Sequence, residues 1–158
     1  MASQPRVRST EDFANSLQET WDNDRSRQKA QVFKYELPNF EKGLGAVRLT
    51  KSDILSALVQ VHKGRGEIQL HAHTAEEGFW WVVGGRVRFY GEDGPIAELG
   101  TNEGIHIPRG FKYRFETSSD APLELLHVAA YVHKVADKRI DYTRMAEDQV
   151  IYDFDGRI

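Results

Sequence analysis

The chain has 158 residues, a length that suits one domain with short extensions and allows a substantial core. Hydrophobic residues make up 40% and charged residues 28%, a composition typical of a globular rather than a disordered protein. The net charge of −3 gives no reason to expect a nucleic acid or a membrane as a partner. Because the sequence has no cysteine, disulfides and Cys-type zinc sites are excluded, and any metal must be held by His, Asp, Glu or Tyr.

Residues 1–30 are expected to form an N-terminal extension. Phe13, Leu17 and Trp21 recur at every fourth position and predict a short amphipathic helix that packs one stripe on the body. The first residues lack the apolar core of a signal peptide, and no apolar run approaches the length of a membrane span. We therefore expect a cytoplasmic protein.

From about residue 31 the sequence changes to short apolar runs that alternate every second residue and are separated by Gly, Pro and Asn. About eight strands with no helix between them indicate an all-β fold, an antiparallel sandwich or barrel over residues 31–135. Residues 136–158 are expected to form a C-terminal extension, in which the charged stretch 136–149 forms a helical turn before the polar end. The predicted strand runs cover residues 31–37, 45–50, 54–63, 67–73, 78–91, 96–100, 104–110, 111–116 and 123–134.

Two histidines stand two residues apart in one predicted strand. Side chains alternate between the faces of a strand, so Gln69, His71 and His73 project to the same side. Two such imidazoles and a carboxylate from the next strand can hold a metal ion and leave coordination positions open for substrate or dioxygen. The alternative is a pair of histidines on a solvated strand face.

The wider pattern favours the metal site. His71-x-His73-x3-Glu77-x6-Gly84 resembles the first signature of the cupin superfamily, and its spacing selects Glu77 rather than Glu76 as the acidic ligand. The resemblance implies an antiparallel double-stranded β-helix, or jelly roll, with His71, His73 and Glu77 as metal ligands. It also favours a homodimer.

A second stretch resembles the second cupin signature less closely. Pro108-Arg109-Gly110 matches its P-x-G core, but Tyr113 stands where metal-binding cupins usually have a histidine ligand, and Thr117 replaces an asparagine. Tyr113 is therefore expected to ligate the metal as a phenolate or to contact the substrate. The other interpretation is that the metal site is weakened or lost.

Strand parity predicts which aromatic residues line the pocket. If Glu77 points inward, then Phe79 and Trp81 do so as well, and Trp80 lies on the outer face, where the N-terminal segment or a second subunit must cover it. Phe79 and Trp81 would give the pocket an apolar floor, although simple core filling explains Trp81 equally well.

Further polar residues have the position and chemistry to serve the site. His127 is a candidate general base, alongside Tyr113 as a proton donor, although a core histidine is an equal alternative. The residues expected to line the substrate pocket are Gln60, Gln69, Phe79, Trp81, His106 and Tyr131.

The predicted function is that of a metal-dependent enzyme with one divalent ion (Fe, Mn, Ni or Zn), acting on a small, partly apolar organic molecule with oxygenase-type, dioxygenase-like chemistry. Two alternatives remain open. One is a non-catalytic small-molecule-binding domain, and the other is a metal-dependent isomerase, cyclase or lyase that uses no oxygen.

Overall fold

The computed structural model describes residues 29–64, 66, 69–143 and 151–158, and within them the chain forms strands and turns but no helix. The helix predicted around Phe13 to Trp21 lies outside the described residues. No helix in the described part of the chain is long and apolar enough to cross a membrane. The strands are β1 (Gly43–Lys51), β2 (Leu55–Lys63), β3 (His71–His73), β4 (Glu76–Gly84), β5 (Val87–Gly91), β6 (Gly94–Leu99), β7 (Gly104–Ile107), β8 (Tyr113–Thr117), β9 (Leu123–Tyr131), β10 (Arg139–Asp141) and β11 (Ile151–Asp155).

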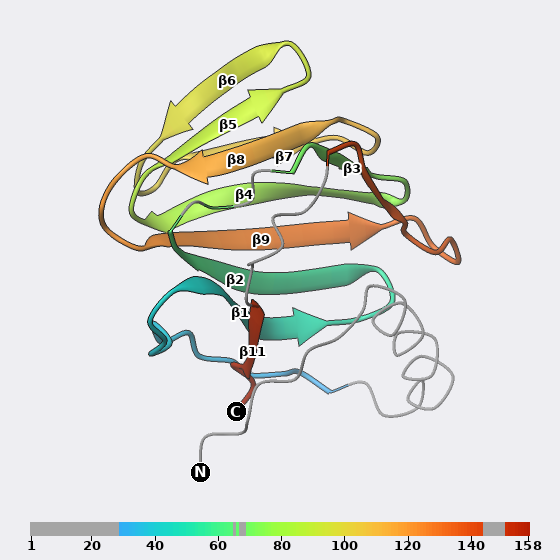
Figure 1. The fold of residues 1–158 in the computed structure, drawn as a ribbon. Coiled ribbons are helices and arrows are strands. Elements are labelled where there is room, and N and C mark those ends of the chain that lie inside the picture. The colour runs from blue at the N-terminus through green and yellow to red at the C-terminus, as the bar shows by residue number, and fades with distance from the viewer. Residues whose placement is uncertain (1–28, 65, 67–68, 144–150) are drawn as a thin grey trace.

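The strands form two sheets. One has six strands in the order β11-β1-β2-β9-β4-β7, and the other has five in the order β10-β3-β8-β5-β6. All neighbours are antiparallel except β1 and β11, which run parallel. Figure 1 shows the β5–β6 hairpin at one end of the molecule and β1 with β11 at the other. The expected all-β jelly roll is confirmed.

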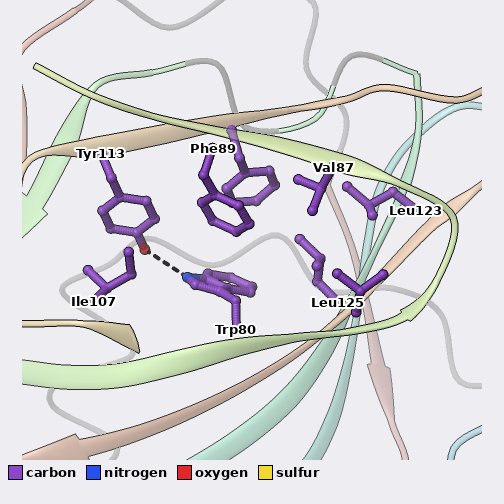
Figure 2. Close-up of a cluster of buried hydrophobic side chains, with 9 residues drawn as sticks. Trp80, Val87, Phe89, Ile107, Tyr113, Leu123 and Leu125 are labelled. Carbon is purple, nitrogen blue, oxygen red and sulfur yellow. Dashed lines mark hydrogen bonds between the residues drawn. The ribbon is translucent and has the colours of Figure 1, made fainter. Parts of the chain in front are cut away.

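The main core lies between the two sheets, because its side chains come from strands of both (Figure 2). Burying each large apolar side chain there stabilises the fold by about 1.5–3 kcal/mol. Trp80 of β4 is the largest of these residues and is 2% exposed. The members of this core are Trp80, Val82, Val87, Phe89, Ile107, Tyr113, Phe115, Leu123 and Leu125.

A second apolar cluster lies on the other face of the six-stranded sheet, over β1 and β2. It is covered by the segment before β1. In this segment Phe40 packs against Tyr152 of β11, with 5.3 Å between the two ring centroids. Tyr35 of the same segment donates a hydrogen bond to Glu124 on β9 at 2.5 Å. This segment therefore serves as a cover. The strand predicted over residues 31–37 is wrong except for an isolated bridge between Phe33 and Arg157.

The C-terminal extension adds one strand to each sheet. β10 pairs with β3, and β11 pairs with β1. The predicted helical turn is wrong where the structure describes it, because residues 139–141 are extended and hydrogen-bonded to β3. Pairing explains the difference. β3 has only one register pair with β8, so β10 satisfies backbone groups that would otherwise lack a partner.

The side-chain parity of β4 is the reverse of the prediction. Trp80 is 2% exposed, whereas Phe79 is 42% and Trp81 is 40% exposed. Phe79 and Trp81 therefore lie on the outer face of the six-stranded sheet and give the pocket no apolar floor. Because the period of a strand is two residues, taking Glu77 rather than Glu76 as the inward carboxylate moves every side chain to the wrong face.

Candidate functional site

His71 and His73 both point into the space between the sheets from β3. His71 is 1% exposed, and its Nδ1 lies 2.8 Å from the carbonyl oxygen of Gln69. His73 is half-buried, and its Nδ1 lies 2.6 Å from Oδ2 of Asp137. The two ring centroids are 5.5 Å apart. The two imidazoles are therefore neighbours on β3.

The carboxylate beside these histidines belongs to Glu76. Its Oε2 lies 3.8 Å from Nδ1 of His73, and its Oε1 lies 3.5 Å from Nε2 of His127. Glu77 faces outward, where its half-exposed side chain pairs with Nε2 of His106 at 3.1 Å. The geometry expected for Glu77 is therefore wrong. Placing Trp80 in the core would have identified Glu76, because residues 76 and 80 share a strand face.

Asp137 was not predicted from the sequence. It lies just before β10, and its two oxygens bridge the site to the neighbouring turn. Oδ2 accepts a hydrogen bond from Nδ1 of His73, and Oδ1 accepts one from the backbone N–H of Ala75 at 2.8 Å. The motif spacing gave no signal for this contact, because 64 residues separate Asp137 from His73.

His73, Glu76 and Asp137 form a group that could hold a metal ion, since one ligand atom from each lies within 4.8 Å of the others. Metal–nitrogen and metal–oxygen bonds of about 2.0–2.2 Å place opposite ligands a little over 4 Å apart, so the spacing of the group is close to what a single ion needs. Nitrogen and oxygen donors without thiolate suit Mn, Fe, Ni or Zn. His71 is not part of this group.

A small pocket opens beside the group. It holds about 220 Å³ of space not filled by atoms, part of it open to solvent. Only about 10 Å³ of it can hold the centre of a water molecule, which is roughly the room for one water, so in this conformation the pocket admits an ion or a water and a substrate must enter from its open side. Polar side chains make up most of the lining, which consists of His73, Glu76, Gly78, Ile107, Pro108, Tyr113 and His127.

Trp80 positions two of the lining residues. Its indole stacks on the imidazole of His127 with 4.0 Å between ring centroids and 12° between ring planes. Its Nε1 donates a hydrogen bond to the hydroxyl of Tyr113 at 3.3 Å, drawn as the dashed line in Figure 2. The predicted catalytic candidates, Tyr113 and His127, are thus both fixed at the pocket by one core side chain.

The remaining predicted pocket residues divide into two groups. Gln60, Gln69 and Tyr131 are inside the barrel but do not line the small pocket. Gln60 contacts Nε2 of His62 at 2.9 Å, Gln69 accepts from Arg139 at 3.2 Å, and Tyr131 contacts Ser56 at 2.9 Å. The second group consists of Phe79, Trp81 and His106. The prediction is wrong for these residues, because their side chains lie on the outer face of β4 and β7.

The charges of the site couple His73 to the two carboxylates. Burial by itself lowers the pKa of His73, but the hydrogen bond to Asp137 and the negative charges of Glu76 and Asp137 outweigh it, so the pKa lies above its usual value. Burial by itself raises the pKa of Asp137. Its hydrogen bonds from His73 and the backbone prevail and hold its pKa below the usual range.

These shifts predict how the stability of the metal-free protein depends on pH. The contribution of His73 is present below its unfolded pKa of 6.5 and is lost as the pH rises through its higher folded value. The contribution of Asp137 is present above 3.8 and is lost as the pH falls through its lower folded value. Urea unfolding should therefore show a larger free energy of unfolding near pH 5.5 than near pH 8.5.

In the His73→Gln variant the free energy of unfolding should no longer be larger near pH 5.5 than near pH 8.5. The His106→Gln variant, changed at an exposed site, should keep this difference. A difference that survives in His73→Gln would contradict the assignment.

Comparison with known proteins identifies the domain. Residues 57–129 match the family model of the cupin domain. These residues form a cupin domain. Within it the segment is similar to mannose-1-phosphate guanylyltransferase of Escherichia coli (strain K12), with 39% identity over 71 residues that cover 44% of this chain. The chain spans only 14% of the length of that relative.

Two solved structures show the same fold as the cupin domain and the strands around it. One is a Klebsiella pneumoniae protein with a double-stranded β-helix domain, at a TM-score of 0.57 and 16% identity, covering 73% of this chain and 100% of that one. The other is a cupin-superfamily sugar phosphate isomerase from Silicibacter pomeroyi, at a TM-score of 0.52 and 14% identity, covering 80% of this chain and 97% of that one. At these identities the likeness is one of fold.

Proposed function

We propose that the cupin domain is a metal-dependent enzyme that moves a proton on a small polar organic substrate, as isomerases and lyases do. The observation that supports this is the gathering of His73, Glu76 and His127 around one small, mostly polar pocket. An apolar floor would have favoured the partly apolar substrate predicted from the sequence, but Phe79 and Trp81 point away from the pocket.

The proposed ligands are His71, His73 and Glu76. Nδ1 of His71 is hydrogen-bonded to the carbonyl oxygen of Gln69, and Nδ1 of His73 is hydrogen-bonded to the carboxylate of Asp137. In each imidazole Nε2 is therefore the nitrogen that would bind the ion. Glu76 replaces Glu77 as the acidic ligand because it alone of the two faces the histidines. A divalent ion held there supplies a Lewis acid that polarises a carbonyl or hydroxyl oxygen of the substrate.

The side chains around the pocket provide the proton transfers. His127 is held by its stacking on Trp80 and is proposed to take a proton from the substrate carbon and return it to the neighbouring atom. The hydroxyl of Tyr113 accepts a hydrogen bond from Trp80, so its own proton is the one it can donate to a substrate oxygen.

The pocket also bears on the substrate class. Among the described residues, its lining contains no Lys or Arg. A phosphate group normally requires such side chains or a helix N-terminus, so we propose a neutral or weakly charged substrate at this pocket. This differs from the phosphorylated sugars named for the isomerase of similar fold.

A panel of small hydroxy-ketones and hydroxy-acids in D2O tests the proposed chemistry. We expect the Mn²⁺-loaded protein to exchange carbon-bound hydrogen for deuterium, observed by proton NMR, without consuming oxygen. The His127→Gln variant should retain metal but slow the exchange by roughly 10²–10⁴-fold, as for the loss of a general base. His106→Gln, which lies outside the pocket, is the matched control.

The same measurement distinguishes a second candidate function. Two imidazoles and one carboxylate also suit an Fe(II) oxygenase, because that ligand set leaves positions open for dioxygen. Oxygen uptake that depends on both Fe²⁺ and a substrate from the panel would favour this function. A protein that binds panel compounds but neither exchanges hydrogen nor consumes oxygen would be a non-catalytic binding domain.

A further inference from the structure

Asp137 reaches the site from outside the segment that matches the cupin family model, which ends at residue 129. Its position is fixed by the backbone around it. Lys138 donates its N–H to the Thr74 hydroxyl at 2.9 Å, and the N–H of Thr74 donates to the carbonyl of Lys138 at 3.0 Å. β10 then continues antiparallel to β3, with Arg139 opposite His73. The C-terminal stretch is therefore attached to the strand that carries both histidines.

Both carboxylate oxygens of Asp137 are already engaged within the protein. Oδ1 accepts the N–H of Ala75, and Oδ2 lies 2.6 Å from Nδ1 of His73. Glu76 is farther from the same nitrogen, at 3.8 Å, which is beyond hydrogen-bond distance. Of these two carboxylates, Asp137 is thus the one within hydrogen-bond distance of Nδ1 of His73.

We propose that Asp137 is a positioning residue rather than a metal ligand: it keeps the proton of His73 on Nδ1 and so directs Nε2 toward the ion. The part of this inference that concerns the ion rests on the function proposed above. Carboxylates that accept the second ring N–H of a metal-bound histidine fix its tautomer and orientation, and their loss typically weakens metal binding by about 10–100-fold.

The Asp137→Asn variant tests this role directly, because the contact of Asp137 with the N–H of Ala75 fixes how the new amide is oriented. The N–H of Ala75 requires an oxygen at the position of Oδ1, so the amide NH2 of the variant will face Nδ1 of His73. An N–H donor there favours an unprotonated Nδ1, which moves the imidazole proton to Nε2. The variant therefore keeps the shape of the site but reverses the tautomer.

Two measurements are needed. The first is Zn²⁺ and Mn²⁺ affinity by competition with a chelator, where we expect Asp137→Asn and Asp137→Ala to bind about 10–100-fold more weakly than the wild type. The second is the ¹⁵N NMR signal of the His73 ring in the metal-free protein, recorded at a pH above which the signal no longer changes, so that the neutral imidazole is observed. We expect Nδ1–H in the wild type and Nε2–H in Asp137→Asn. Asp141→Asn, on the same strand and bonded to Arg139 at 2.8 Å, should match the wild type in both.

Affinity within twofold of the wild type in Asp137→Asn would overturn the positioning role, and so would an unchanged tautomer. An altered fold is detected separately by the unfolding midpoint of each variant. If the wild type binds neither ion, the proposed metal-dependent function fails. The tautomer comparison still decides whether Asp137 controls His73.

Discussion

Replacing Glu76 by Gln should abolish the metal binding proposed above, whereas the same change at Glu77 should leave it unaltered. Glu76 lies within 3.8 Å of His73, and Glu77 pairs with His106 on the opposite face of the strand. Losing a residue that only hydrogen-bonds to a metal ligand weakens metal binding by roughly 10–100-fold. Losing a ligand itself should weaken metal binding by more than this. The two variants differ from each other by one position and by no net charge, so each controls for the other.

The measurement is elemental analysis of untagged protein after incubation with equal concentrations of Mn²⁺, Fe²⁺, Ni²⁺ and Zn²⁺ under exclusion of oxygen. His73→Ala should lose the ion in the same way as Glu76→Gln. Retention of metal by Glu76→Gln together with its loss from Glu77→Gln would show that the carboxylate implied by the motif spacing is the ligand after all. Thermal unfolding of both variants confirms that the comparison is made between folded proteins.

The second large effect concerns the neighbouring tryptophans. Trp80→Ala should lower the free energy of unfolding by about 3–5 kcal/mol, because it opens a cavity between the two sheets. Trp81→Ala should cost less than about 1 kcal/mol, since Trp81 is 40% exposed on the outer face. Urea unfolding at fixed pH measures both. Equal costs for the two variants would mean that the parity of β4 is not as described.

Trp80→Phe separates packing from the polar role of this residue. It preserves an aromatic ring near His127 and removes the hydrogen bond to the hydroxyl of Tyr113. We expect a loss of about 1–3 kcal/mol, because the buried Tyr113 hydroxyl then lacks that donor. A cost as large as that of Trp80→Ala would show that the indole nitrogen, rather than the volume of the ring, dominates.

The sequence predicted the fold class and the two histidines because both are local signals. Alternation of apolar residues identifies strands, and a single intervening residue places His71 and His73 on one face. The choice between Glu76 and Glu77 failed because motif spacing counts residues along the chain, whereas the strand determines which face each residue occupies. The extreme burial of Trp80 is the physical reason that Glu76 points inward.

Asp137 and the strands around it could not be predicted in this way. Residues 136–143 are charged and short of apolar alternation, so their sequence favours a turn. Their extended conformation comes from pairing with β3, a contact between parts of the chain that are 64 residues apart at Asp137 and His73. Local propensity carries no information about such a pairing, and tertiary context decides it.

Because β10 and β11 follow the segment that matches the family model and complete one sheet each, assembly of the two sheets depends on strands that are synthesised after that segment. A nascent polypeptide that has emerged only as far as residue 129 already carries both imidazoles and Glu76 but has neither the Asp137 carboxylate nor the partner strand of β3. A recombinant fragment trimmed to the family-matched residues 57–129 would lack these parts and β1 as well. Chaperone contact during translation would therefore be most needed before β10 and β11 are available.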